Sequence, residues 1–200
     1  MLLFVGFCGI IVTGNIKKEE ATNMDTYMPM ATTDRHNRFV ATFMNRIFGR
    51  VEKGEVHALQ EQCPLVYLGT RELPAGFELA DVKNIKNMEN FLDNITELEY
   101  VNPDFMLFLD NPYVKNKKGT RTAGQPDLIV EIWSDSNTEN NRAFLQNLYA
   151  TSPVTEHWYI EQDSNAVQCY MGKNRLPDQC LTNMLITQKG LKFDLRYLAV

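Results

Sequence analysis

Runs of apolar and polar residues divide the chain into predicted helices and strands. The segment DRHNRFVATFMNRIFGRVEKG, from Asp34 to Gly54, spaces its apolar residues along one face of a helix. Thr33 or Asp34 can cap the start of this helix, and Gly54 can end it. Similar spacing predicts a second helix over residues 84–98 and a third over 140–149.

Short apolar runs predict the strands, at residues 64–68, 76–82, 104–110, 127–133, 157–161, 166–171 and 190–200. The run DLIVEIW is almost wholly apolar, which is typical of a central strand covered on both faces. The stretch NPYVKNKKGTRTAGQ between two of these strands is predicted to be a polar loop. This order of elements indicates an α/β or α+β fold, in which helices flank a mixed sheet.

Composition and charge narrow the class of protein. The chain has 200 residues, of which 44% are hydrophobic, so we expect one domain with a sizeable core. The net charge of −5 excludes an overall basic field for nucleic acid, but it is compatible with an acidic metal site. The four cysteines form no CxxC pair and no zinc-spaced cluster, so we expect reduced thiols and a cytoplasmic protein.

The N-terminal run MLLFVGFCGIIVTGN raises the question of targeting. The run is shorter than a comfortable membrane span, and no basic residue precedes it as in a signal peptide. We expect no membrane partner and a single domain over residues 1–200, with 1–20 forming a strand or an extension. A misassigned upstream start is the alternative.

Two acidic residues in predicted strands are candidates for chemistry. Asp104 opens one strand, and Glu131 lies inside the next, on the same strand face as Asp127. A carboxylate on a buried strand is costly unless it is paired or binds a cation. If the two strands are neighbours, Asp104 and Glu131 can converge and hold Mg²⁺ or Mn²⁺. Such an ion can hold a phosphodiester and lower the pKa of a bound water.

Three blocks of the chain carry a family pattern: VNPDFMLF, QPDLIVEIWSDSN and LYATSPVTEHWYIE. One Pro-Asp begins a strand, a second is followed by three apolar residues and Glu131, and Tyr149 precedes Trp158 by the family's separation. These blocks, with MPMATTDRHNRF upstream and GLKFDLRYL downstream, resemble the Uma-type restriction endonuclease family of the PD-(D/E)xK nuclease superfamily.

The resemblance implies a restriction-endonuclease-like mixed sheet flanked by helices and hydrolysis of DNA phosphodiester bonds with Mg²⁺ or Mn²⁺. It implies that Asp104 and Glu131 are catalytic metal ligands. It also implies a further acid near the N-terminus, for which Glu19 or Glu20 is the nearby candidate.

The catalytic lysine of the family is missing. The superfamily has Lys two residues after the Glu, where this chain has Trp133, and the Uma-type family has it four residues before the Tyr, where this chain has Leu145. Arg142 lies one turn away and is a candidate for electrostatic replacement, although Arg is a poor proton acceptor. Two functions therefore stay open: an endonuclease of reduced activity, or an inactive nuclease-fold module for binding or assembly.

A basic run lies between the two acid-bearing strands, at Lys115, Lys117, Lys118 and Arg121. It is predicted to contact DNA phosphates, and the alternative is a solvated hairpin tip. Cleavage of both strands of a duplex usually takes two sites, so a homodimer is a candidate assembly.

Structural roles are the alternative for several of these residues. Asp104 can cap a strand end, and Glu131 can pair with an Arg such as Arg121. Asp127 is predicted to be a turn residue and His36 a hydrogen-bonded residue at the start of a helix. We expect Trp133, Trp158 and Tyr149 to lie in the core.

Overall fold

The computed structural model describes residues 34–60, 64–67, 92–93, 101–111 and 113–200. The chain divides into two units, Met1–Ala31 and Thr32–Val200, and every described residue lies in the second. The expectations for residues 1–20 and 76–82, and for most of 84–98, fall outside the described residues. In the described part of the chain, no helix combines the length and the apolar content that crossing a membrane requires.

The first described element is helix α1 (Asp34–Glu52), which agrees with the prediction from its apolar spacing. The helix ends where expected, because Gly54 has a φ of 70° and its N–H donates to the carbonyl of Val51. Glycine adopts this left-handed conformation without steric cost, which makes it a common residue at the end of a helix.

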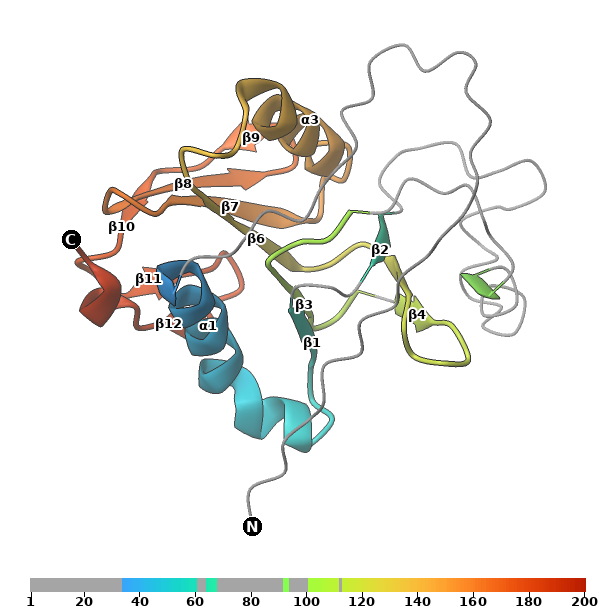
Figure 1. The fold of residues 1–200 in the computed structure, drawn as a ribbon. Coiled ribbons are helices and arrows are strands. Elements are labelled where there is room, and N and C mark those ends of the chain that lie inside the picture. The colour runs from blue at the N-terminus through green and yellow to red at the C-terminus, as the bar shows by residue number, and fades with distance from the viewer. Residues whose placement is uncertain (1–33, 61–63, 68–91, 94–100, 112) are drawn as a thin grey trace. The chain divides into compact units, whose positions relative to one another are not determined.

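The largest sheet that the described residues form has seven strands. Six lie side by side in the order β1 (His57–Gln60), β3 (Phe105–Phe108), β6 (Leu128–Trp133), β7 (Glu156–Glu161), β8 (Ala166–Met171) and β10 (Gln179–Cys180), and β9 (Asn174–Arg175) pairs with β8 (Figure 1). Only β6 and β7 run parallel among these pairs, and helix α3 (Glu139–Tyr149) makes the crossover between them. The prediction of a mixed sheet flanked by helices is confirmed.

Two smaller sheets complete the described elements. One has the order β2 (Leu65–Tyr67), β5 (Thr122–Gly124) and β4 (Tyr113–Lys115), and the other pairs β11 (Leu185–Ile186) with β12 (Lys192–Phe193), followed by the 3-10 helix η2 (Arg196–Leu198). The prediction of a polar loop before β6 is therefore wrong, because Val114 and Ala123 are buried and pair across a hairpin. The predicted closing strand over 190–200 is also shorter than expected.

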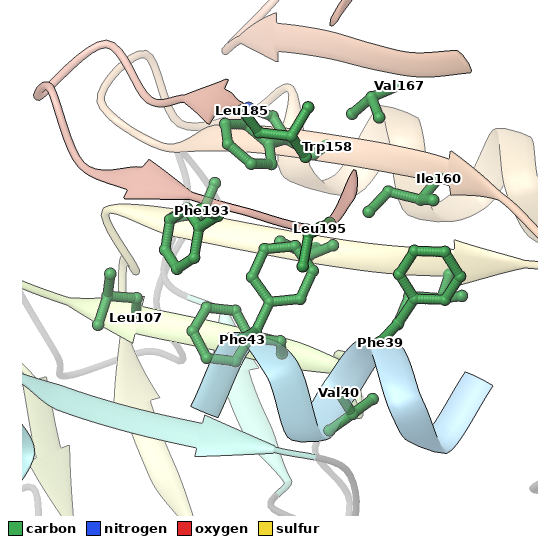
Figure 2. Packing of buried hydrophobic residues seen from close by; sticks show 14 of the residues in the cluster. Phe39, Val40, Phe43, Leu107, Trp158, Ile160, Val167, Leu185, Phe193 and Leu195 are labelled. Atoms are coloured by element: carbon green, nitrogen blue, oxygen red, sulfur yellow. The ribbon is translucent and has the colours of Figure 1, made fainter. Parts of the chain in front are cut away.

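Two apolar clusters cover the two faces of the large sheet. The α1-side core joins Phe39 and Phe43 of α1 to alternate strand residues and to the C-terminal residues Phe193 and Leu195 (Figure 2). The α3-side core joins the other strand face to α3, and its members are Leu65, Val101, Met106, Phe108, Ile129, Trp133, Leu145, Leu148, Tyr149 and Tyr159. All six residues of β6 are buried, because both faces of this strand are covered.

Candidate active site

Asp104 directly precedes β3 and Glu131 lies in β6, and these two strands are neighbours in the sheet, which is the condition on which the predicted convergence of the two acids depends. Strands β3 and β6 are antiparallel neighbours in which Phe105 pairs with Val130. Asp104 precedes Phe105 and Glu131 follows Val130, so extending this register by one residue sets the two acids across from each other. The site thus begins with two carboxylates at matching positions of neighbouring strands.

The Asp104 carboxylate is held by one backbone group and one side chain. The N–H of Ile132 donates to its Oδ2 at 2.6 Å, which continues the ladder of β3 past its last pair. Nε2 of His36 lies 3.1 Å from its Oδ1, and the side chains of His36 and Asp104 are only 7% and 14% exposed. His36 stands in the first turn of α1 and is hydrogen-bonded there, as predicted.

Glu131 is a buried carboxylate on the α3 face of the sheet. It is 4% exposed, and the hydroxyl of Tyr149 donates to its Oε1 at 2.6 Å. A charge-assisted hydrogen bond of this kind offsets part of the free energy needed to remove the carboxylate from water. The acid in the middle of an apolar strand therefore has a partner from the last residue of α3.

The carboxylate oxygens of Asp104 and Glu131 are the type of ligand that a hard divalent cation prefers. Mg²⁺ is usually bound by one or two carboxylates, with water and substrate oxygens completing its shell. Asp104 and Glu131 supply two carboxylates, and within the described ranges no three His, Cys, Asp or Glu residues gather around one point. Each carboxylate already accepts a protein hydrogen bond, so an ion shared between them would join or replace these contacts.

The two positions at which the family resemblance implies a lysine belong to the α3-side core in this chain. Trp133 and Leu145 are buried to 3% and 5% exposure and belong to the same cluster as Tyr149. Leu145 lies one helical turn before Tyr149, whose hydroxyl reaches Glu131, so this position faces the candidate site.

Arg142 is occupied by structural contacts. Its guanidinium donates to Oε1 of Glu161 at 2.6 Å and to the backbone carbonyls of Ser134 and Asn137, and it lies over the ring of Trp133. These contacts tie the loop after β6 to α3 and β7. They give no support to the expectation that Arg142 supplies the charge of the lysine that the family resemblance implies.

Asp127 is a structural residue of the second Pro-Asp, as predicted. Its Oδ2 accepts the N–H groups of Leu109, Asp110 and Asn111, which form the turn after β3. Its Oδ1 is paired with the ammonium group of Lys189. A buried carboxylate with several donors holds a turn in place and has little capacity left for a ligand.

The predicted phosphate-binding residues lie on the β4–β5 hairpin. Lys117 and Lys118 are exposed at its tip, Lys115 is half-buried in β4, and Arg121 donates to the carbonyl of Leu92. The tip is shaped by Asn116, whose Oδ1 accepts the N–H groups of residues 120 and 121. The geometry is that of a solvated hairpin tip, and its contact with DNA stays a prediction.

Sequence reasoning missed the polar groups beneath α3. Tyr149 lies in the core as predicted, but its hydroxyl has a specific acceptor in Glu131. His157, which had no predicted role, is buried between Tyr159 and the carbonyl of Gly172. Burial lowers the pKa of His157 to about 4. The available signal was the even spacing of His157 and Tyr159 in one strand, which placed both polar groups on one face.

Comparisons with known proteins agree with this architecture. The model of the Uma2 family, described as "Putative restriction endonuclease", matches residues 88–198. The chain belongs to the Uma2 family. A solved structure with a similar fold is "a putative nuclease belonging to DUF820" from Anabaena variabilis, at 13% identity and a TM-score of 0.55, covering 86% of this chain and 85% of that one. No curated protein matches the sequence.

Membership in Uma2 confirms the resemblance carried by the two Pro-Asp blocks and by the Tyr149–Trp158 spacing. Family and fold together indicate a restriction-endonuclease-like nuclease. The predicted acids Glu19 and Glu20 lie outside the described residues.

Proposed function

We propose that this Uma2 protein is a metal-dependent endonuclease that hydrolyses DNA phosphodiester bonds at a reduced rate. The observation that carries the proposal is the register of β3 and β6, which sets Asp104 across from Glu131 in a nuclease-like sheet. Both carboxylates would hold Mg²⁺ or Mn²⁺. When bound, the ion supplies charge stabilisation at the phosphate and a more acidic water.

The residues around the two acids have defined tasks in this proposal. His36 and the N–H of Ile132 orient the Asp104 carboxylate, and Tyr149 orients that of Glu131. The exposed Lys117 and Lys118 attract the DNA backbone, since phosphate contacts position a duplex without reading its sequence. The base of their hairpin is connected to the segment before β3, because Thr122 pairs with Leu65 and Leu65 bridges to Val101.

The activity is expected to be low because no lysine occupies the family position. A single preorganised hydrogen-bond donor aimed at developing negative charge contributes about 10²–10³ in rate, and we expect a positioned cation to contribute on this order. Leu145 cannot supply this charge, and Arg142 is paired with Glu161. We further propose that the active assembly is a homodimer, since a double-strand break requires two sites.

A plasmid-nicking assay tests the proposal. Purified full-length protein should slowly convert supercoiled DNA to the nicked form with Mg²⁺ or Mn²⁺ and should not do so with EDTA. Glu131→Gln, Glu131→Ala and Asp104→Asn should abolish nicking. The matched control is Asp135→Asn, which removes an exposed carboxylate from the loop just after β6 and should leave the rate unchanged. Wild-type protein that fails to nick DNA with every divalent ion tested would refute the endonuclease, and nicking that persists in EDTA would refute its metal dependence.

A second candidate is a nuclease-fold module that binds metal or DNA without cleaving, and it rests on the burial of Leu145 in the lysine position. Calorimetric titration with Mn²⁺ separates the two. Metal binding together with metal-dependent nicking supports the endonuclease, and metal binding without nicking supports the module.

A further inference from the structure

A group of buried hydrogen bonds lies between the large sheet and α3. The hydroxyl of Tyr149 meets Glu131 at 2.6 Å, and the hydroxyl of Tyr159 meets Nδ1 of His157 at 2.8 Å. Nε2 of His157 lies 2.9 Å from the carbonyl oxygen of Gly172. Glu131 and Tyr159 are paired across β6 and β7, so both hydroxyls lie on the sheet face that α3 covers.

The direction of each hydrogen bond follows from chemistry. The carbonyl of Gly172 can only accept, so Nε2 of His157 carries the proton and donates. Burial lowers the pKa of His157 to about 4, so the ring is neutral near pH 7 and its Nδ1 has no proton. Nδ1 therefore accepts, and the Tyr159 hydroxyl donates its single proton to His157.

These directions give the two tyrosines different tasks. The proton of Tyr159 is used by His157, while the proton of Tyr149 is used by Glu131, because the carboxylate is the acceptor. Tyr149 is fully buried at the end of α3, and its ring meets the ring of His157 edge-on at 6.1 Å. A ring held in this way keeps its hydroxyl at a fixed place relative to Glu131.

We propose that Tyr149 is a positioning residue, whose hydroxyl holds the Glu131 carboxylate in the orientation that binds the divalent cation. The inference rests on the proposed metal site. It assigns to the α3 tyrosine a role beyond packing, and it places the ring of His157 against the Tyr149 ring as its support. Removal of a protein group that orients a metal ligand typically lowers the metal affinity about 10- to 100-fold.

The test compares two substitutions that each remove one buried hydroxyl and keep the ring. Mn²⁺ is titrated by calorimetry into full-length wild type, Tyr149→Phe and Tyr159→Phe, and thermal unfolding is recorded for each. Tyr149→Phe is expected to raise the Kd for Mn²⁺ about 10- to 100-fold. Tyr159→Phe should leave the Kd near the wild-type value. A purely structural role would lower the unfolding temperature of both variants without a selective effect on Kd.

Each outcome decides a different point. If wild type binds Mn²⁺ and Tyr149→Phe binds it equally well, the positioning role is overturned and the metal site stands. Equal weakening in both variants also overturns the role, because the effect is then one of general packing. If wild type binds no Mn²⁺, the metal site and the inference fall together. If Tyr149→Phe does not fold, His157→Gln takes its place in the test. This variant removes the ring that supports Tyr149 and should raise the Kd for Mn²⁺. An unchanged Kd in His157→Gln would refute the inference.

Discussion

Placing a lysine at the position of Leu145 tests how the site is built. Leu145 is 5% exposed and lies one turn before Tyr149, whose hydroxyl contacts Glu131. Leu145 and Tyr149 share the face of α3 that packs on the sheet, so a lysine there would place its ammonium group in the α3-side core, which also surrounds the Glu131 carboxylate. The substitution therefore adds a cation beside a buried anion, and its effects on stability and on cleavage can be estimated separately.

The stability effect is a balance of two terms. Burying an ammonium group costs several kcal/mol when it has no partner. At a separation of about 4 Å and an effective dielectric constant of about 20, attraction to Glu131 returns about 4 kcal/mol. The Lys stem also fills most of the volume of the leucine. We expect Leu145→Lys to remain folded and to lose about 1–3 kcal/mol of unfolding free energy.

Cleavage should change in the opposite direction. A cation at this point can stabilise the charge that develops on the phosphate, and a single preorganised donor with that task contributes about 10²–10³ in rate. Plasmid nicking with Mn²⁺ should therefore be faster for Leu145→Lys than for wild type. Leu145→Met is the matched control, because methionine has a long unbranched side chain like that of lysine but carries no charge.

A specific result would refute this reasoning. If Leu145→Lys is folded by circular dichroism and nicks DNA no faster than Leu145→Met, the position does not face the reacting phosphate. A gain that survives Glu131→Gln in the same protein would show that the new activity arises elsewhere.

Three further predictions follow from other contacts. Asp127→Asn should lower the free energy of unfolding, measured in urea, by about 2 kcal/mol, because the buried side chain loses the charge that its hydrogen-bond donors and Lys189 stabilise. Asp110→Asn, which removes an exposed carboxylate paired with the same lysine, should change it little. Equal effects of the two substitutions would contradict this prediction. The pKa of His157 is lowered by burial from 6.5 to about 4, so the unfolded chain takes up the proton first as pH falls. This stabilising contribution is complete above pH 6.5 and is lost as the pH falls toward 4, which lowers the free energy of unfolding by about 3 kcal/mol. Wild type should therefore lose more stability than His157→Gln between pH 6.5 and pH 4. Parallel curves of stability against pH for the two proteins would argue against this expectation. Replacing Lys117 and Lys118 by Ala should weaken DNA binding and lower the slope of log Kd against log salt by about 0.9 for each lost phosphate contact, and an unchanged slope would place the DNA on another surface.

Elements with strong periodicity were predictable from the sequence. Helix α1 carries its apolar residues on one stripe and has Gly54 at its end, so its start and end were both expected. Strand β6 is wholly buried, as its apolar run indicated. The hairpin of β4 and β5 was missed, because each strand has three residues and its pairing to β2 comes from a distant segment. The residues of a short strand do not by themselves indicate which distant strand will pair with it.

The sequence alone determined the family pattern and the two acids at predicted strands, because these depend on residue identity and on local periodicity, whereas the pairing of those strands came from the tertiary structure. Only the tertiary structure decided what surrounds each acid: His36 reaches Asp104 from α1, and Tyr149 reaches Glu131 from α3. It also decided that Arg142 serves Glu161 and two backbone carbonyls. The physical reason is that a hydrogen-bond partner is chosen by packing between elements far apart in the chain, which spacing along one element does not encode.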